Sequence, residues 1–297
     1  MAGANDYPST VDLLIVSGSS RVRTAAPINH RIYADHIGVP YLFDLAPSIV
    51  SRIYLHKLDV LRRALPLAEW VFWIDDDAFF TDFSIDLRAF LEGAEGVDLV
   101  FARSPVNPKG GWTWMSSGQF FIRRSPDTIA LLDAVADTDL SVVKAWWDHD
   151  RYGLFTNGDQ DALVYQLIGP AGEERWRDRW LRLDWPSFNS RPYHYESSLD
   201  EHFVCHFAVP GGRPKHEVVA EFAARLGTTP ALVDADRLVP YRTFLERSEL
   251  GPLVGVMPPP PPVRRQATSP TKAKTPRTLA GRAARRAKRL GRRITGR

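Results

Sequence analysis

Three consecutive aspartates, Asp75, Asp76 and Asp77, directly follow an apolar run at residues 70–74. Carboxylates beside apolar residues are costly to bury unless a positive charge neutralises them, and a divalent cation does so. In an extended segment, Asp75 and Asp77 project to one side and Asp76 to the other. Two oxygen ligands on one side suit Mn²⁺ or Mg²⁺, with diphosphate oxygens and water completing the shell. We therefore expect a metal site, whereas a solvated acidic turn is the alternative interpretation.

A histidine inside a second apolar run, VCHF at residues 204–207, is the next candidate for metal chemistry. His206 is either a hydrogen-bonded core histidine or a metal ligand. His202 would share a face with His206 in a strand, so a zinc site is an alternative, although no cysteine or carboxylate has zinc-site spacing. The loop at residues 210–215 follows and combines two glycines with Arg213 and Lys215. It is either a positive loop that closes over phosphates or a plain surface turn.

The segment NGDQDAL at residues 157–163 combines a turn signal with polar side chains. Asn-Gly favours a turn, and Asp159 is suited to cap the helix that follows. Helix capping is therefore one interpretation of Asp159. The other interpretation places Asp159 or Gln160 at the mouth of a site, beside a bound sugar.

The elements that must position these residues alternate between strands and helices. Short apolar runs predict strands at residues 11–17, 39–45, 70–74, 97–102, 119–122 and 203–208. Apolar periodicity with start and stop residues predicts helices at residues 27–37, 48–65, 86–91, 126–136, 159–168 and 217–226. This alternation predicts an α/β fold with a mostly parallel sheet and helices on both faces. Such sheets bind ligands at the carboxyl ends of their strands, where the aspartates stand.

The charge distribution divides the chain into a body and a tail. We expect one domain at residues 1–255, then a proline-rich linker and a disordered basic tail at residues 256–297. Residues 263–297 contain thirteen Lys or Arg and no Asp or Glu, so the net charge of +3 leaves −10 on the rest. One cysteine, Cys205, excludes an internal disulfide. With no signal-peptide pattern and no spanning apolar run, these features predict a cytoplasmic protein.

Taken together, the motifs resemble the galactosyltransferase family of the yeast mannan and plant xyloglucan xylosyltransferase type, glycosyltransferase family 34. More distantly, they resemble the glycogenin-like glycosyltransferases. The ordered set is more specific than any single motif and covers roughly residues 11–215. The matching pieces are NHRIYA at residues 29–34, Lys57, WIDDDA at 73–78, SGQFFIR at 117–123, DQDAL at 159–163, FNS at 188–190 and HF at 206–207.

The resemblance implies a GT-A fold, a Rossmann-like sheet that carries a nucleotide-sugar, and it assigns roles to individual residues. Asp75 and Asp77 would be metal ligands and His206 the third protein ligand, while Asp159 and Gln160 would face the transferred sugar and the acceptor. The residues that would bind the nucleotide-sugar are Ser17, Gly18, Arg23, Lys57, Asp76, Ser117, Gly118, Arg213 and Lys215. Two departures from the family pattern affect this assignment: Ser116 stands where the family usually has Asn, and the loop after His206 is not the usual short His-Phe-x-Gly.

The implied reaction is transfer of a sugar to a hydroxyl of a glycan or a lipid-linked acceptor. A Mn²⁺ or Mg²⁺ ion would offset the charge that develops on the departing nucleoside diphosphate. Members of the family retain the anomeric configuration, whereas an inverting enzyme would need an Asp or Glu base. The resemblance implies UDP-galactose, UDP-xylose or UDP-glucose as donor, with GDP-mannose as an alternative.

Two other classes of protein are compatible with parts of the sequence. A phosphotransferase of the haloacid dehalogenase kind also has Asp-x-Asp after a strand, but usually near the N-terminus and followed by Thr or Val where Phe79 stands here. Alternatively, the basic tail could bind an anionic membrane surface or nucleic acid. The tail has no aromatic residue to stack on bases, which argues against nucleic acid. We expect salt-sensitive attachment to the inner face of the membrane, and a solubilising tail is the alternative.

Overall fold

A computed structural model describes residues 10–46, 53–208 and 213–256 of the 297-residue chain. The predicted proline-rich linker and basic tail lie outside the described residues, as do the two glycines of the loop after His206. Within the described part, no helix is long and apolar enough to span a membrane.

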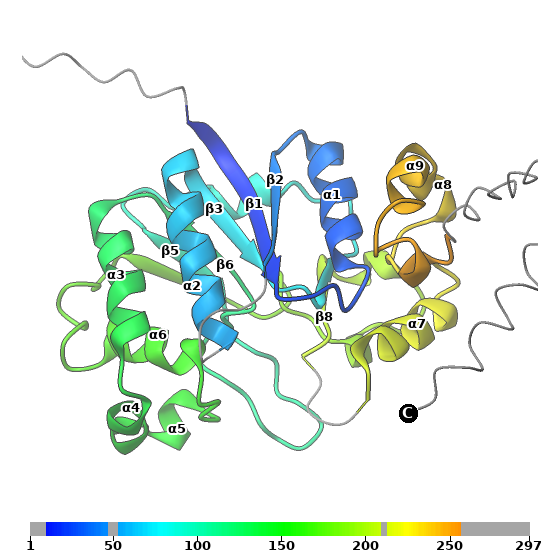
Figure 1. Cartoon of the computed structure of the whole chain (residues 1–297). Coiled ribbons are helices and arrows are strands. Elements are labelled where there is room, and N and C mark those ends of the chain that lie inside the picture. Colours follow the sequence, from blue (N-terminus) through cyan, green and yellow to red (C-terminus); the bar gives the residue numbers. More distant parts are fainter. Residues whose placement is uncertain (1–9, 47–52, 209–212, 257–297) are drawn as a thin grey trace, which may run out of the picture. The chain divides into compact units, whose positions relative to one another are not determined.

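The centre of the structure is a six-stranded sheet with the order β2-β1-β3-β6-β5-β7 (Figure 1). Five strands run parallel, and β6 alone is antiparallel to its neighbours β3 and β5. This confirms the predicted mostly parallel sheet. The short, half-buried edge strand β7 was not predicted, because Arg182 interrupts the apolar residues of WLRL. The strands are β1 Val11–Ser19, β2 Tyr41–Leu45, β3 Ala68–Ile74, β5 Leu99–Ala102, β6 Gln119–Arg123 and β7 Trp180–Leu183.

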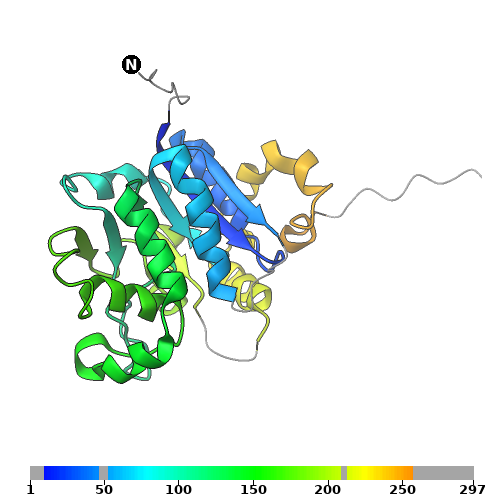
Figure 2. The same cartoon turned by 60° about the vertical axis from the view of Figure 1, so that its left-hand side comes forward.

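Helices cover both faces of the sheet, as the pattern predicted (Figures 1 and 2). Helices α2 (Ile53–Ala64), α3 (Pro126–Asp137) and α6 (Asp159–Ile168) enclose one apolar core with β1 and β3. Helix α1 (Ala26–Ile37) packs on the other face, in a core that includes Phe72 and Phe188. The remaining helices are α4 Leu140–Trp146, α5 His149–Tyr152, α7 Lys215–Arg225, α8 Ala235–Leu238 and α9 Arg242–Leu245. The predicted helix at residues 86–91 is a 3₁₀ helix, Leu87–Leu91.

A second, two-stranded sheet joins two distant parts of the chain. Strand β4 (Ala78–Phe80) begins directly after the three aspartates and pairs antiparallel with β8 (Val204–His206). In this register Ala78 lies opposite His206. The pairing therefore brings the predicted histidine ligand next to the aspartates.

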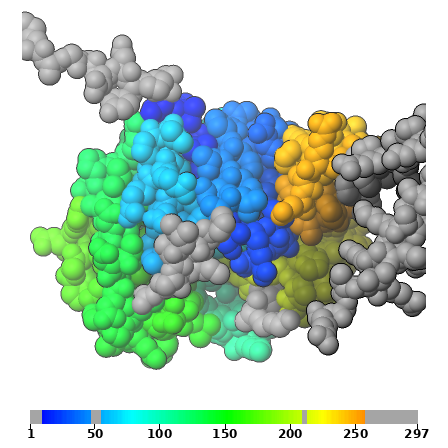
Figure 3. Space-filling view, in the orientation of Figure 1, coloured from blue at the N-terminus to red at the C-terminus, as the bar shows by residue number. Residues whose placement is uncertain are grey.

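The C-terminal helices complete the surface beside α1. Figure 3 shows α8 and α9, in orange, next to the blue surface of α1. Leu238 and Leu245 are buried in one cluster with Ile28 and Ile32 of α1. Tyr241 adds a 2.6 Å hydrogen bond from its hydroxyl to the Asp35 carboxylate. These contacts stabilise α1, which lies against β4 and so supports the aspartate turn.

His30 of α1 makes the stability of the domain depend on pH. The ring is fully buried, and Nε2 lies 2.8 Å from the Ala78 carbonyl oxygen. Burial lowers its pKa from 6.5 to about 4. The folded state therefore binds fewer protons than the unfolded chain between these values, and stability is lost as the pH falls through that window. We expect His30 to contribute a loss of about 3 kcal/mol between pH 7 and pH 4.

Urea unfolding of the wild type and of His30→Gln at pH 7.5, 6.0 and 4.5 measures this effect. The variant is expected to be less stable at pH 7.5 but to lose less stability on acidification. His206 and His194 have pKa values lowered to about 3 and about 4, so a residual slope of the same sign is expected in the variant. If the free energy of unfolding changes equally with pH in the two proteins, the proposed role of His30 is contradicted.

Candidate active site

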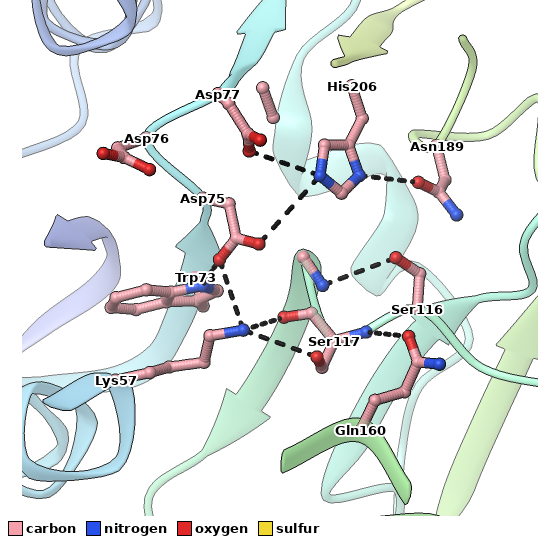
Figure 4. A network of polar contacts seen from close by, with 12 residues as sticks. Lys57, Trp73, Asp75, Asp76, Asp77, Ser116, Ser117, Gln160, Asn189 and His206 are labelled. Atoms are coloured by element: carbon pink, nitrogen blue, oxygen red, sulfur yellow. Dashed lines mark hydrogen bonds and ion pairs between the residues drawn. The ribbon is translucent and has the colours of Figure 1, made fainter. Parts of the chain in front are cut away.

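The three aspartates form the turn between β3 and β4, and their side chains point in two directions (Figure 4). Asp75 and Asp77 face His206: the distance from His206 Nε2 is 3.3 Å to Asp77 Oδ1 and 4.0 Å to Asp75 Oδ2. Asp76 points the other way and accepts a 2.6 Å hydrogen bond from Ser19 Oγ. The side chains thus point in the predicted directions, but the backbone is not extended as predicted: residues 76–77 form a turn, with a 3.1 Å hydrogen bond from the Ala78 N–H to the Asp75 carbonyl oxygen.

The three facing side chains form a group that suits a divalent cation. One ligand atom from each of Asp75, Asp77 and His206 lies within 4.8 Å of the others. Burial, with a smaller effect of Arg191, lowers the pKa of His206 to about 3, so its ring is neutral near pH 7. A neutral imidazole and two carboxylates are the ligand types that Mn²⁺ accepts. No group with such spacing includes His202 in the described residues, and its ring packs on Trp185 instead, which contradicts the zinc alternative.

Gly118 has no side chain, and this allows His206 and Asp75 to approach each other at this point. It directly precedes β6, and its carbonyl accepts a 2.8 Å hydrogen bond from the Asp75 backbone N–H. A Cβ at this position would lie 2.4 Å from His206 Cε1 and 3.2 Å from Asp75 Oδ2. Because real side chains do not approach this closely, only glycine allows the aspartate turn and His206 to keep their positions. The requirement for glycine supports a cation site at this point.

Lys57 connects the aspartate turn to the start of α6. Its Nζ lies 3.2 Å from Asp75 Oδ1 and 3.0 Å from Asp159 Oδ2, and it donates a 2.8 Å hydrogen bond to the Ser117 carbonyl. Although burial opposes the charge, Asp159 and Asp75 raise the pKa of Lys57. Gln160 Oε1 accepts a 3.2 Å bond from the Ser117 backbone N–H. The predicted pair is thus held near Asp75 by two interactions: the ion pair of Asp159 with Lys57 and the hydrogen bond of Gln160 with Ser117.

We expect Lys57→Met to destabilise the protein by about 3 kcal/mol, because it leaves the buried Asp159 carboxylate and the partly buried Asp75 carboxylate without this positive partner. Urea unfolding in the presence of EDTA measures this loss without interference from metal. Lys144→Met, on the exposed side of α4, is the matched control and should change stability by less than about 0.5 kcal/mol. Similar behaviour of the two variants would show that the Lys57 ion pairs contribute nothing to folding.

A cleft of about 210 Å³ opens beside the aspartates. Its wall includes Trp73, whose Nε1 donates a 2.7 Å hydrogen bond to Asp75 Oδ1 and fixes that carboxylate. Burial raises the pKa of Asp76, which also lines the cleft. The lining residues are Gly18, Ser19, Ser20, Arg23, His56, Lys57, Trp73, Asp75, Asp76, Asp77, Asp159 and Lys215.

Lys215, at the start of α7, contacts the Asp77 carboxylate and lies on the cleft wall. Arg213, predicted to contact phosphates with it, pairs instead with Glu221 on the outside of α7 and is absent from the lining. Ser17 is fully buried, and its Oγ lies 2.6 Å from the Tyr41 hydroxyl. The structure therefore brings Lys215 to the cleft but not the side chains of Arg213 and Ser17.

Two residues of this region had no role in the sequence-based assignment. Trp73 belonged to the apolar run and to the matching WIDDDA piece, but neither pattern assigned a contact to its indole N–H. Asn189 was part of the matching FNS motif, and its Oδ1 lies 3.3 Å from His206 Nδ1 (Figure 4). Membership in that motif was the only signal in the sequence.

Comparison with curated proteins finds relatives that are named glycosyltransferases. "Probable glycosyltransferase 3" of Oryza sativa subsp. indica is 32% identical over 185 residues, which cover 52% of this chain and 38% of that protein. "Galactomannan galactosyltransferase 1" of Cyamopsis tetragonoloba is 28% identical over 202 residues, covering 56% of this chain and 43% of that protein. The chain thus spans about two fifths of the length of the curated relatives it matches. No protein-family model matches the chain.

A solved structure shares the arrangement of strands and helices. It is a glycosyltransferase involved in the glycosylation of the major capsid of PBCV-1, with a TM-score of 0.52 and 12% identity. The match covers 71% of this chain and 98% of that one. The fold is that of a GT-A glycosyltransferase. This confirms the predicted fold class, and the names of the sequence relatives agree with the predicted class of enzyme, whereas membership in family 34 stays a prediction.

Proposed function

We propose that this protein is a metal-dependent glycosyltransferase that moves a sugar from a nucleotide-sugar to a hydroxyl acceptor. The observation that carries the proposal is the convergence of Asp75, Asp77 and His206 at the edge of a cleft in a glycosyltransferase fold. Sequence similarity to proteins named glycosyltransferases supports the same class of reaction. The haloacid dehalogenase alternative explains neither this similarity nor the histidine beside the aspartates.

Each residue of the site has a task in this reaction. Asp75, Asp77 and His206 would hold Mn²⁺ or Mg²⁺, which as a Lewis acid stabilises the departing diphosphate when bound. Lys215 would pair with the diphosphate, since its ammonium group already lies among the cleft carboxylates. Asp76 and the β1 loop, through Gly18 and Arg23, would contact the nucleoside on the opposite wall.

Asp159 and Gln160 would face the transferred sugar from the start of α6. Lys57 fixes one Asp159 oxygen, and Ser117 fixes the Gln160 carbonyl. The Gln160 amide N–H₂ has no partner in the described part of the chain and is available to donate to a sugar hydroxyl. We infer retention of configuration, with the leaving phosphate accepting the proton of the acceptor hydroxyl. The Lys57 ion pair supports this, because it leaves Asp159 poorly suited to act as a general base.

The donor is inferred to be a UDP-hexose or UDP-pentose and the acceptor a glycan or lipid-linked sugar. The name of the Cyamopsis relative motivates UDP-galactose and mannan oligosaccharides as the first pair to test. The experiment incubates the full chain with Mn²⁺, mannohexaose and each of UDP-galactose, UDP-glucose, UDP-xylose and GDP-mannose, and then records the anomeric configuration of the product by NMR.

An α-linked product from an α-linked donor, formed only with metal, is the expected result. A β-linked product would overturn retention but leave the glycosyltransferase proposal intact. If no donor is transferred to mannohexaose or hydrolysed, and none stabilises the protein in the presence of Mn²⁺, the proposal is wrong.

We further propose that the chain works in the cytoplasm, at the inner face of the membrane. The proposal rests on the thirteen positive charges at residues 263–297, which would attract anionic lipid. Flotation with phosphatidylserine vesicles at low salt, with the full chain and with a variant ending at residue 262, tests it. Equal flotation of the two proteins would contradict a role of the tail.

A further inference from the structure

The side-chain amide of Asn189 lies between three fixed partners next to the metal site. Its Nδ2 donates a 2.9 Å hydrogen bond to the Arg103 carbonyl oxygen. Its Oδ1 accepts a 2.5 Å bond from Arg191 Nη1 and lies 3.3 Å from His206 Nδ1. Asn189 is fully buried, so water does not replace any of these partners. The amide is thus held at both ends.

The chemistry of the partners allows only one orientation of this amide. A backbone carbonyl can only accept a hydrogen bond, and a guanidinium can only donate. Rotation of the amide by half a turn would place its oxygen against the Arg103 carbonyl and its N–H₂ against Arg191. Both hydrogen bonds would be replaced by repulsive contacts in a buried position, at a cost of about 1–3 kcal/mol for each unsatisfied group. Asn189 therefore presents an oxygen, not an N–H, to His206.

This orientation determines which nitrogen of His206 carries the hydrogen. Because Asn189 Oδ1 can only accept, His206 Nδ1 must donate, and the Nε2 of a neutral ring is then unprotonated. Nε2 is the atom that faces Asp75 and Asp77. We propose that Arg191 is a positioning residue that sets the metal-binding tautomer of His206 through Asn189. The proposal rests on the metal-binding role of His206 in the proposed function.

The surroundings of Arg191 fit this role. Its Nη1 also donates to the backbone carbonyls of Asn189, at 3.0 Å, and Ser190, at 3.3 Å. Within the described residues it has no carboxylate within 4.0 Å, unlike Lys57, so an ion pair does not explain its position. The hydrogen bonds of its guanidinium in the described residues all go to Asn189 and Ser190. Partners of this kind behind a ligating histidine affect metal affinity about 10- to 100-fold.

The tautomer can be measured directly in metal-free protein. Long-range ¹H–¹⁵N correlation spectra of protein labelled at its histidines distinguish Nδ1–H from Nε2–H, and His206→Gln identifies the signals of His206. We expect a single Nδ1–H tautomer near pH 7.5 in the wild type. An Nε2–H tautomer in the wild type would overturn the proposal without any variant being needed.

Two variants and a control then test the contribution of Arg191. Arg191→Met removes the donor and is expected to give a mixture of tautomers and a 10- to 100-fold weaker Mn²⁺ affinity by calorimetry. Arg191→Lys keeps a donor and should restore most of both. The control is Arg225→Met, since Arg225 also donates to backbone carbonyls nearby, of Tyr195 and Pro192, but has no contact with Asn189.

Folded Arg191→Met protein with the wild-type tautomer and Mn²⁺ affinity would overturn the proposal. If Arg191→Met does not fold, Arg191→Lys is compared with Arg225→Met. An Nε2–H tautomer in folded Arg191→Lys or in the wild type, with Nδ1–H retained in Arg225→Met, would then overturn the proposal. A wild type with the Nδ1–H tautomer but no Mn²⁺ affinity would overturn the proposed function instead, so the two failures are distinguishable.

Discussion

Asp75→Asn and Asp77→Asn are each expected to abolish metal-dependent binding of the nucleotide. Each change removes one of the two carboxylates that face His206 and are proposed to hold the metal, and an amide oxygen is a much weaker ligand for Mn²⁺. In the wild type, UDP at 100 times its Kd with Mn²⁺ should raise the free energy of unfolding by about 2.7 kcal/mol. Both variants should lose this increment and their transfer activity. Thermal unfolding with and without Mn²⁺ and UDP measures the change.

Two further variants make this test specific. Asp76→Asn alters the same turn, but its side chain faces Ser19, so we expect Mn²⁺ affinity to be retained while nucleotide binding weakens. Asp150→Asn removes a charge on the surface of α5 and should leave both measurements unchanged. Nucleotide stabilisation of Asp75→Asn or Asp77→Asn equal to that of Asp150→Asn would mean that these aspartates hold no metal.

Gly118→Ala is expected to be nearly as damaging, although it adds a single methyl group. The new Cβ would lie 2.4 Å from His206 Cε1, so either the ring or the strand must move. Moving the ring displaces Nε2 from Asp77, and we expect Mn²⁺ affinity to fall at least about 100-fold, with a loss of about 1–3 kcal/mol in stability from overpacking. Calorimetric titration with Mn²⁺ and urea unfolding in EDTA measure the two effects separately.

Gly158→Ala is the matched control for this substitution. Gly158 immediately precedes α6 in an extended conformation, and its added Cβ would have only Thr156 Oγ1 within 4.0 Å. We expect this variant to bind Mn²⁺ like the wild type. An unchanged Mn²⁺ affinity in Gly118→Ala would contradict the proposal that the ion is held by His206 and Asp75, against which Gly118 packs.

The sequence was sufficient to predict the part of the site that depends on local geometry. The alternation expected of an extended segment predicted that Asp75 and Asp77 face one side and Asp76 the other; the directions agree, although the backbone there is a turn and not extended. The apolar run before them predicted a buried strand, since only a central strand has such a run. His206 was placed in a strand for the same reason, although its role as a ligand came from the resemblance.

Contacts between segments that are distant in the sequence could not be predicted from it. The ion pairs of Lys57 with Asp75 and Asp159 join segments far apart in the sequence, and no local pattern states whether Lys57, Arg62 or Arg63 of α2 points inward. Strand β4 was missed because its three residues follow the aspartates without a turn signal. Arg213 was expected at the cleft together with Lys215. The two residues are two positions apart at the start of α7, so their side chains point to different sides. Which of the two faces the cleft depends on tertiary packing, which the sequence does not state.

The pairing of β4 with β8 has a consequence for the order in which the protein is made and assembled. Asp75 and Asp77 emerge from the ribosome long before His206, which lies about 130 residues later in the chain. A nascent chain that ends before β8 therefore carries the acidic turn without the third proposed ligand, His206, and without the strand that pairs with β4. High-affinity metal loading would then occur only after synthesis has passed β8, so bound Mn²⁺ would report that the N- and C-terminal parts of the domain have been joined.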